Sequence, residues 1–363
     1  MKVLHVYQVY RPDDFTGIPR VIWELCESMT ELGVTSEVLC LSNAPSNEPI
    51  MIGRHVVHQA KRNIRIASAS FSIEIFRKFK DLVGRFDVVH YHFPWPQGDL
   101  LYLAYGRKTP SVVTYHSDIV KQKTLKRLYA PVQTLFLRMI DRIVATSPNY
   151  VDSSVVLSRF NDKITVIPIG LGERVEPDDR DLEAWRAKVG QGFFLFVGAL
   201  RYYKGLSYLI DAARITGLPV VIAGRGEIDV KILPSNVHYV GEINDADKEC
   251  LLKLSRAFVF PSHLRSEAFG LALLEAARAG RGMISCEIGT GTTYVNEKNV
   301  TGIVIPPHNV EALAEAMIYL YECDEDCEKF GKNALKRFNN LFKVQIMRDL
   351  YFLKYLEINK KNN

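Results

Sequence analysis

The chain has 363 residues, a length that two domains of ordinary size would fill. Its 47% hydrophobic and 24% charged residues are typical of globular proteins and exclude a disordered, collagen-like or coiled-coil chain. The net charge of +5 is concentrated in residues 1–170, which hold 21 Lys and Arg against 15 Asp and Glu. This excess suits an anionic surface or substrate, or is simply a solvated basic face. We expect no nucleic-acid partner.

Cysteine usage and hydropathy indicate where the protein resides. The six cysteines are scattered without a Cys-x-x-Cys pair, which argues against a disulfide framework or a metal cluster. No apolar run reaches the length of a membrane span, and residues 1–10 lack the core of a signal peptide. We therefore expect a cytoplasmic protein.

Short β-branched runs, each followed by a stretch with helical spacing, recur along the whole chain. This alternation predicts parallel-sheet α/β units. The runs in the first half are 3–7, 38–41, 88–92, 112–115, 143–146 and 164–167, and those in the second half are 193–197, 220–223, 237–240, 258–260, 283–285 and 303–305. Because each half contains six such runs, we predict two similar doubly wound domains.

A passage rich in Gly, Pro and charge separates the two halves. It runs from Gly170 to Asp181 and has no apolar period, so we place the junction and a hinge at 170–190. The predicted domains are 1–172 and 190–342. Residues 343–358 follow as a terminal helix. The acids Asp178 to Asp181 lie in this junction, and we interpret them as solvated and not as metal ligands.

In the first half, polar or glycine residues follow two predicted strands, at the sheet edge where parallel α/β domains bind ligands. Gly17 precedes a predicted helix with Pro19 in its first turn, and His116 directly follows the strand 112–115. His116 can be functional or structural. His90 and His92 share one face of a strand, but no third ligand is evident, so we predict no metal site.

In the second half, a buried strand leads into a loop with the cations Arg201 and Lys204, a pairing suited to a diphosphate. Glu267 and Glu275 follow the strand 258–260, and on one helix they would lie about 12 Å apart along its axis. Alternatively, Glu267 is a capping acid and Glu275 a surface residue. We expect further anion contacts at two glycine-containing helix starts, from Phe269, Gly270 and Leu271 and from Thr290, Gly291 and Thr292.

The segment Glu267-Ala-Phe-Gly-Leu-Ala-Leu-Leu-Glu275, together with the motifs above, resembles the family 4 glycosyltransferases over nearly the full length. The resemblance implies the GT-B fold, two Rossmann-like domains facing a cleft, with the final helix crossing back to the first domain. It implies that Glu267 contacts the donor sugar, that Glu275 holds the nucleoside ribose, and that His116 lies at the catalytic site. Lys204 matches the diphosphate-binding Lys, whereas Ala199 stands where the family usually has Arg, so that Arg201 would take the role.

The segments 200–205 and 289–296 are similar to bacterial O-antigen and capsule mannosyltransferases. The predicted function is a retaining transfer of a hexose to a hydroxyl of a polysaccharide or lipid-linked glycan. The favoured donor is GDP-mannose, with a UDP-hexose as the other option, and no metal or other cofactor is expected. The alternatives are a non-catalytic glycan-binding subunit, a GT-B epimerase and a glycogen-type glucosyltransferase.

A basic stretch precedes a helix with apolar positions at Leu128, Val132, Leu135 and Met139. Its cations are Lys121, Lys123, Lys126 and Arg127. Cations and apolar insertion together could hold the protein on the inner face of the membrane. A helix whose apolar side packs on the first domain is the alternative.

Overall fold

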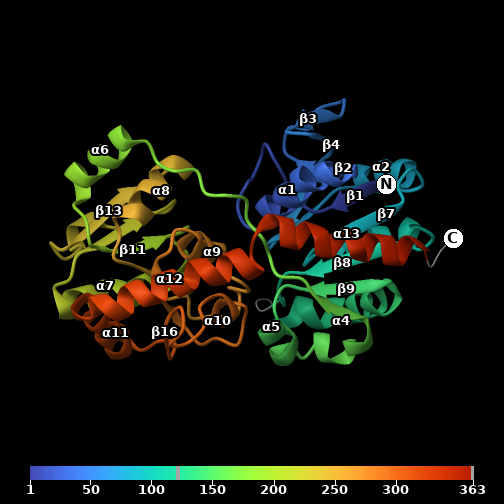
Figure 1. The fold of residues 1–363 in the computed structure, drawn as a ribbon. Helices are drawn as coiled ribbons and strands as arrows, with labels where there is room; N and C mark the ends of the chain where they lie inside the picture. The colour runs from blue at the N-terminus through green and yellow to red at the C-terminus, as the bar shows by residue number, and fades with distance from the viewer. Residues whose placement is uncertain (120–122, 361–363) are drawn as a thin grey trace. The chain divides into compact units, whose positions relative to one another are not determined.

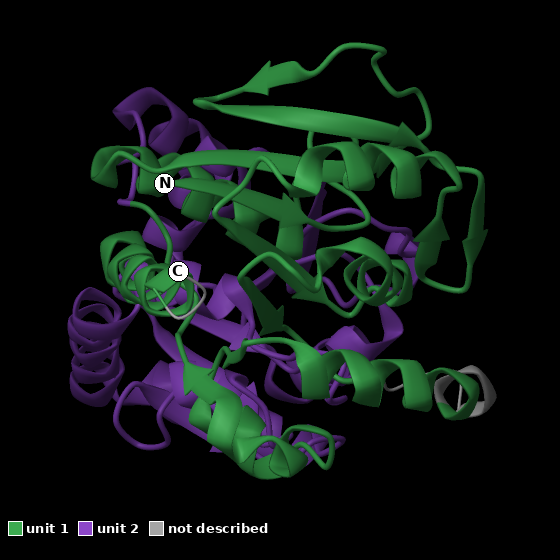
Figure 2. Cartoon of the chain, turned by 90° about the vertical axis from the view of Figure 1, so that its right-hand side faces the viewer, with its two compact units in different colours: residues 1–172, 343–363 green, residues 173–342 purple. Residues whose placement is uncertain are grey.

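The computed structural model describes residues 1–119 and 123–360, which divide into two compact units. Unit 1 comprises residues 1–172 and 343–363, and unit 2 comprises residues 173–342 (Figure 2). The chain therefore leaves unit 1 once and returns to it once.

Unit 1 is built on an eight-stranded sheet with the order β10-β9-β8-β7-β1-β2-β4-β3 (Figure 1). Neighbouring strands pair in parallel, except that β3 runs antiparallel to β4. The strands are β1 (Lys2–Val6), β2 (Thr35–Ser42), β3 (Ile50–Ile52), β4 (His55–Lys61), β7 (Val88–Phe93), β8 (Ser111–Tyr115), β9 (Arg142–Ala145) and β10 (Ile164–Val166). A separate hairpin joins β5 (Ile64–Ile66) to β6 (Ala69–Phe71).

Helices connect these strands, as parallel pairing requires. The helices of unit 1 are α1 (Ile18–Met29), α2 (Glu74–Val83), α3 (Pro96–Leu101), α4 (Lys123–Met139), α5 (Pro148–Ser153) and α13 (Val344–Lys360). The C-terminal helix α13 packs against α1 and β7, although hundreds of residues separate them in sequence (Figure 1). Its Tyr351 and Tyr355 are buried in unit 1.

The two segments that connect unit 1 to unit 2 lie side by side. Leu171 forms a parallel bridge with Lys343, and the Val344 N–H donates to the Leu171 carbonyl at 2.9 Å. Gly170 permits this approach, because a Cβ there would lie 2.6 Å from the Lys343 carbonyl oxygen. Both connections are thus anchored to each other within unit 1.

Unit 2 is built on a six-stranded parallel sheet with the order β13-β12-β11-β14-β15-β16. Its strands are β11 (Phe194–Val197), β12 (Val220–Ala223), β13 (Val237–Gly241), β14 (Ala257–Phe260), β15 (Gly282–Cys286) and β16 (Gly302–Ile305). Its helices are α6 (Asp179–Val189), α7 (Leu206–Thr216), α8 (Asp245–Leu254), α9 (Leu271–Arg278), α10 (Thr292–Val295), α11 (Val310–Glu322) and α12 (Asp324–Leu341). Aromatic and aliphatic residues from the central strands and from α7 and α11 form its core.

A buried ion network fixes the first residues of unit 2. The Glu249 carboxylate on α8 accepts from the Arg278 guanidinium at 2.5 Å and from the Arg174 guanidinium at 2.7 Å. Arg174 follows the crossing at residues 172–173 and is thereby held against α8 and α9. The network needs all its members, because a buried charge without its partner is strongly destabilising.

Each of the twelve predicted strands overlaps an observed one, and four observed strands, β3 to β6, were not predicted. The prediction that residues 178–181 lie in an irregular linker was wrong. The Asp178 side chain accepts from the Arg180 N–H and begins α6, whose first turn contains Asp179 and Asp181. The acids support this helix because its N-terminus carries partial positive charge.

Candidate functional site

The carboxyl edge of the unit 2 sheet holds a partly buried pair of opposite charges. Lys204 lies in the loop after β11, Glu267 lies in the loop after β14, and the Lys204 ammonium donates to the Glu267 carboxylate. Both side chains are 13% exposed, and the Lys204 Nζ lies 4.8 Å from the Phe260 ring centre. The prediction from sequence placed both residues at this edge without indicating their direct contact.

Close backbone approaches join the loops that carry this pair. Gly205 has a positive φ of 72°, and a Cβ there would lie 2.0 Å from the Pro261 carbonyl oxygen. The His263 N–H donates to the Tyr203 carbonyl at 3.0 Å. The loops after β11 and β14 therefore form one structure that holds Lys204 beside Glu267.

Two exposed arginines lie in loops at the same edge, Arg201 close to Lys204 in sequence and Arg225 after the neighbouring strand β12. Arg201 lies three residues before Lys204, and its side chain is exposed. Arg225 follows β12, is also exposed, and its carbonyl accepts from the Leu200 N–H at 2.9 Å. Arg225 was not among the site residues predicted from the sequence, and the two glycines that flank it do not make the full dinucleotide-binding pattern. The carboxyl edge of this sheet thus carries several cations, among them Lys204, Arg201 and Arg225, an arrangement suited to an anionic ligand.

Glu267 and Glu275 do not lie on one helix, and the predicted separation along a helix axis was wrong. Helix α9 begins at Leu271, because Gly270 before it has a φ of 87° that no helical residue adopts. Glu275 lies in the second turn and is 7% exposed, which also excludes the alternative of a surface residue. Its carboxylate accepts from the Lys248 ammonium on α8 at 2.6 Å.

The predicted backbone contacts at the two helix starts need correction. Gly291 already donates its N–H to the Ala268 carbonyl at 2.8 Å, so this group is not available to a ligand. Thr290 and Thr292 are buried, with their hydroxyl oxygens 3.2 Å apart. Phe269 and Gly270 precede α9, whose first N–H groups are those of Leu271 and Ala272, and the anion contacts expected from Phe269, Gly270 and Leu271 stay a prediction.

In unit 1, His116 directly follows β8 and is 5% exposed. It belongs to a group of buried histidines with His5 on β1 and with His90 and His92 on β7. Burial lowers the pKa of His116 to about 3, and it lowers the pKa of His92 well below its ordinary value, so these rings are neutral at pH 7. Gly17 is the N-cap of α1, with a positive φ of 63°.

A polar cavity of about 400 Å³ lies at the carboxyl ends of β1 and β2 and against the β5–β6 hairpin. Carboxylates, guanidinium groups, amides and hydroxyls line it, from Gln8, Asp13, Asp14, Asn43, Arg62, Arg65, Ser68 and Ser70 among others. The Arg62 and Asp13 side chains approach to 3.9 Å, and the Ser42 hydroxyl donates to Asp13 at 3.2 Å. This mixture of donors and acceptors can bind a ligand with several hydroxyl groups. Sequence analysis missed it, because its residues come from four separate segments.

The predicted membrane-binding stretch is described only in part. Lys121 and the side chains of Lys123 and Lys126 lie outside the described residues, whereas Arg127 is exposed. Leu128, Leu135 and Met139 of α4 are 75%, 45% and 37% exposed. Val132 is half-buried, and α4 packs on unit 1 through Phe136 and Leu137, which are fully buried. The helix thus has an apolar side on unit 1, as the alternative predicted, but Leu128, Leu135 and Met139 do not belong to it. Among the described residues, no helix is long and apolar enough to span a bilayer.

Comparison with known proteins identifies the family. The model of the glycosyl transferases group 1 matches residues 178–337, and that of Glycosyltransferase Family 4 matches residues 15–171. The D-rhamnosyltransferase WbpZ of Pseudomonas aeruginosa is 47% identical over 94% of this chain and 92% of its own length. The chain belongs to glycosyltransferase family 4. Its family 4 relatives also include the O-antigen chain mannosyltransferase C of Escherichia coli, 46% identical over 97% of both chains.

Solved structures show that this family 4 chain has the GT-B fold. A sucrose-phosphate synthase from Thermosynechococcus elongatus superposes with a TM-score of 0.80 over 98% of both chains at 17% identity. Anabaena HepE in complex with UDP gives a TM-score of 0.78 over 98% of this chain and 100% of its own at 14% identity. The predicted fold is thus confirmed, and the protein is a glycosyltransferase that transfers a hexosyl group.

Proposed function

We propose that the protein transfers a mannosyl group from GDP-mannose, with retention of configuration, to a hydroxyl of a growing O-antigen or another lipid-linked glycan. The observation that carries this proposal is the partly buried Lys204–Glu267 pair at the carboxyl edge of unit 2, with the exposed Arg201 nearby. The donor and acceptor are inferred from the relative named O-antigen chain mannosyltransferase C.

The charges of this edge suit the two parts of a sugar nucleotide. In the proposal, Lys204 and Arg201 bind the diphosphate and stabilise the charge that develops as it leaves. Glu267 turns from Lys204 to the hydroxyls of the donor sugar, whereas Glu275, held by Lys248, accepts from the ribose hydroxyls. Transfer then requires no metal. EDTA treatment tests this point, and a requirement for added Mg²⁺ or Mn²⁺ would overturn it.

D-Rhamnose is the second candidate for the transferred sugar, because the 47%-identical relative is a D-rhamnosyltransferase. D-Rhamnose is mannose without the 6-hydroxyl, so the two donors present the same diphosphate and ribose. A site built to bond the 6-hydroxyl discriminates strongly against the deoxy sugar, whereas a site without such a bond tolerates both. Comparing kcat/KM for GDP-mannose and GDP-D-rhamnose therefore decides between the two candidates.

The decisive experiment measures release of nucleoside diphosphate from GDP-mannose, GDP-D-rhamnose and UDP-glucose, with and without a lipid-linked glycan acceptor. Acceptor-dependent release with GDP-mannose supports the proposal, and NMR of the product checks the retained anomeric configuration. Binding without turnover would indicate a non-catalytic subunit. Conversion of the donor without acceptor would indicate an epimerase, and turnover with UDP-glucose on a glucan would indicate a glycogen-type enzyme.

The polar cavity of unit 1 is the proposed site for the acceptor sugar, since its guanidinium and carboxylate groups suit the hydroxyls of a glycan. Arg65→Ala should raise the KM for acceptor and leave the KM for donor unchanged. Arg159 is also an exposed cation of unit 1 but does not line the cavity, so Arg159→Ala is the matched control. An equal rise of the acceptor KM in both variants would contradict this assignment.

Peripheral membrane binding through α4 forms part of the same proposal, because a lipid-linked acceptor lies at a membrane surface. The exposed apolar residues Leu128 and Leu135 on this helix support it. Flotation with anionic liposomes should decrease in the Leu128→Ser, Leu135→Ser double variant, and in a variant with Ser at Lys121, Lys123, Lys126 and Arg127. Leu353→Ser on α13 changes a residue that is 63% exposed and serves as control. Unchanged flotation in both α4 variants would exclude this surface.

A further inference from the structure

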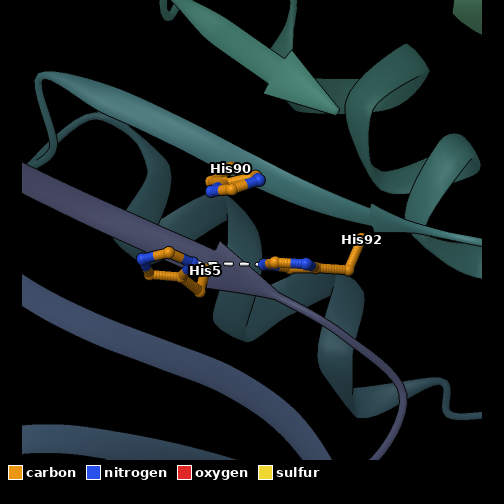
Figure 3. Close-up of side chains that lie close together, drawn as sticks. All are labelled: His5, His90 and His92. Carbon is orange, nitrogen blue, oxygen red and sulfur yellow. Dashed lines mark hydrogen bonds between the residues drawn. The ribbon is translucent and has the colours of Figure 1, made fainter. Parts of the chain in front are cut away.

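Three buried imidazoles form a continuous row across neighbouring strands of unit 1. His5 Nδ1 on β1 lies 3.2 Å from His92 Nε2 on β7, as Figure 3 shows. His92 Nδ1 lies 3.0 Å from Nε2 of His116, which follows β8. The three side chains are 0%, 3% and 5% exposed, so water cannot substitute for these contacts.

The row borders a second group that involves His90. Nitrogen atoms of His5, His90 and His92 all lie within 4.8 Å of one another, so their positions alone would allow a metal ion. His90, however, uses both nitrogens, with the Tyr355 hydroxyl at 2.7 Å and the Thr114 hydroxyl at 2.6 Å. Among the described residues, only Nε2 of His5 lacks a partner in this trio. A zinc ion bound here would need a free lone pair from one nitrogen of each ring, with each nitrogen about 2.0 to 2.1 Å from the ion. In His90 and His92 both ring nitrogens already take part in hydrogen bonds.

The hydrogen bonds along this row of imidazoles can point in only two directions. Burial lowers the pKa of His5 to about 3 and keeps His92 and His116 neutral as well, so each ring carries one N–H and one lone pair. In one direction His5 donates from Nδ1 to His92, and His92 donates from Nδ1 to His116. The N–H of His116 then lies on its Nδ1. In the other direction His116 donates from Nε2, and the N–H of His5 lies on Nε2.

The unpartnered nitrogen of His5 distinguishes the two directions. In the second direction this Nε2 is a buried N–H without an acceptor, whereas in the first it is an unused lone pair. Buried N–H groups without partners are rarer in proteins than acceptors with unused lone pairs. The first direction is therefore favoured.

We propose that His92, backed by His5, is a positioning residue that fixes His116 as the Nδ1–H tautomer. This inference rests on the proposed function, together with the place at the catalytic site that the family resemblance implies for His116. With Nε2 occupied by His92, His116 can only donate from Nδ1, so its substrate partner is an acceptor oxygen of a hydroxyl or phosphate group. In this tautomer His116 cannot act as the base that deprotonates the attacking hydroxyl.

The tautomer can be measured without any substrate. In the full chain labelled with ¹⁵N-histidine, long-range ¹H–¹⁵N spectra distinguish Nδ1–H from Nε2–H, and His116→Gln assigns the resonance. The expected result is Nδ1–H for His116. An Nε2–H signal in the wild-type protein would overturn the proposal.

Variants of His92 test its positioning role. An Asn carboxamide can place an N–H close to the position of Nδ1, so His92→Asn should keep the His116 tautomer and most of the turnover. His92→Leu cannot donate, so His116 should lose its single tautomer and kcat should fall about tenfold or more, which corresponds to about 1.4 kcal/mol. The KM for donor should change little. His90→Asn is the control, since His90 is equally buried but does not contact His116.

The outcomes separate this inference from the proposed function. An unchanged His116 tautomer in His92→Leu, or an equal tautomer change in His90→Asn, would contradict the positioning role. If His92→Leu alters the tautomer but not the turnover, the tautomer assignment stands and the role of His116 in transfer fails. If His92→Leu does not fold, the wild-type spectrum and His92→Asn still decide the question.

Discussion

The central strands of the two sheets differ in what they bury. In unit 2, β11 and β14 contain only apolar residues, with Phe194, Phe196 and Phe258 packed in the interior. In unit 1, the corresponding inner strands β1 and β7 contain His5, His90 and His92, all with 3% exposure or less. One fold has therefore been stabilised in two ways, by apolar packing in unit 2 and partly by hydrogen bonds in unit 1.

This difference indicates which kinds of change destabilise each unit. An apolar core responds to changes of volume, whereas a buried polar group destabilises the protein as soon as its partner is removed. Unit 2 has ion pairs at the sheet edge and in the Glu249 network, and the polar residues buried beside β15, such as Ser285 and Asn296, carry no charge. Changes of charge state should therefore affect the core of unit 1 and only the periphery of unit 2.

Acidification should produce the largest effect and should unfold unit 1 first. In the unfolded chain a histidine has a pKa of about 6.5. In the folded protein, burial lowers the pKa of His5 and His116 to about 3. It also lowers the pKa of His90 and His92 well below the ordinary value. Since the unfolded state binds more protons, each such histidine lowers the free energy of unfolding by up to about 1.4 kcal/mol per pH unit between 6.5 and its folded pKa. Above pH 6.5 this contribution is fully present.

Hydrogen exchange resolved by peptide, measured from pH 7.5 to pH 4.5 with correction for the intrinsic rate, checks this prediction. The protection of unit 1 should decrease with falling pH more steeply than that of unit 2. His92→Asn should reduce the pH slope of unit 1, whereas His238→Asn should not, because His238 is an exposed residue of unit 2. Equal slopes for the two units would break the comparison.

Glu249→Gln should give the next largest effect and should act on unit 2. Its carboxylate is 5% exposed and pairs with both Arg278 and Arg174, so the variant removes the buried counter-charge that the two guanidinium groups share; Arg174 keeps its contact with Glu176, which is 69% exposed. The expected loss is about 3 to 5 kcal/mol in the free energy of unfolding. Urea denaturation followed by Trp185, the tryptophan of α6, reports this unit. Glu328→Gln, in an exposed pair with Lys332, should cost less than about 0.5 kcal/mol.

Lys204→Ala should reduce turnover about 10²- to 10³-fold with little loss of donor affinity, because the charge on the leaving diphosphate grows in the transition state. Steady-state kinetics with calorimetric donor binding separates the two quantities. Lys332→Ala, which removes an exposed cation of the same unit, should change neither. A loss confined to donor affinity would show that this edge of unit 2 binds substrate without assisting the reaction.

Tyr355→Phe should have the smallest effect, and it isolates hydrogen bonding in unit 1 from volume. The substitution removes a hydroxyl 2.7 Å from His90 Nδ1 and leaves the ring in place. We expect a loss of about 1 to 3 kcal/mol, measured by thermal or urea unfolding. Tyr105→Phe in the same unit, where the side chain is 41% exposed, should be neutral. Equal stabilities of the two variants would mean that the polar core of unit 1 contributes little.

The strands could be predicted wherever burial on both faces gives a continuous apolar run, as in β11 and β14. Strand β4 was missed because His55, His58 and Gln59 interrupt its apolar pattern. These residues find partners that are distant in sequence. His55 lies 2.8 Å from the Glu27 carboxylate, and His58 lies near Glu37. A polar residue that is satisfied from another element cannot be distinguished from a surface residue in a single sequence.

The candidate site was predictable to the level of a sheet edge. Lys204 and Glu267 each follow a predicted strand, so the sequence predicted both at the carboxyl edge. Nothing in the sequence indicated the left-handed backbone of Gly270, after which a helix begins between Glu267 and Glu275. Likewise His5 and His92 lie on separate strands and His116 directly follows a third, and only the strand order brings them into one row. The residues that follow one strand are neighbours in sequence, whereas residues that meet across two strands are far apart in sequence.

The bridge between Leu171 and Lys343 gives the chain a modular topology. Residues 173–342 are a continuous insertion into unit 1, and the two cut ends that their removal would leave are already hydrogen-bonded neighbours. A short Gly/Ser linker from residue 172 to residue 343 could therefore close unit 1 with little loop entropy. The same adjacency would let unit 2 of another family member be exchanged as one cassette, with unit 1 kept intact.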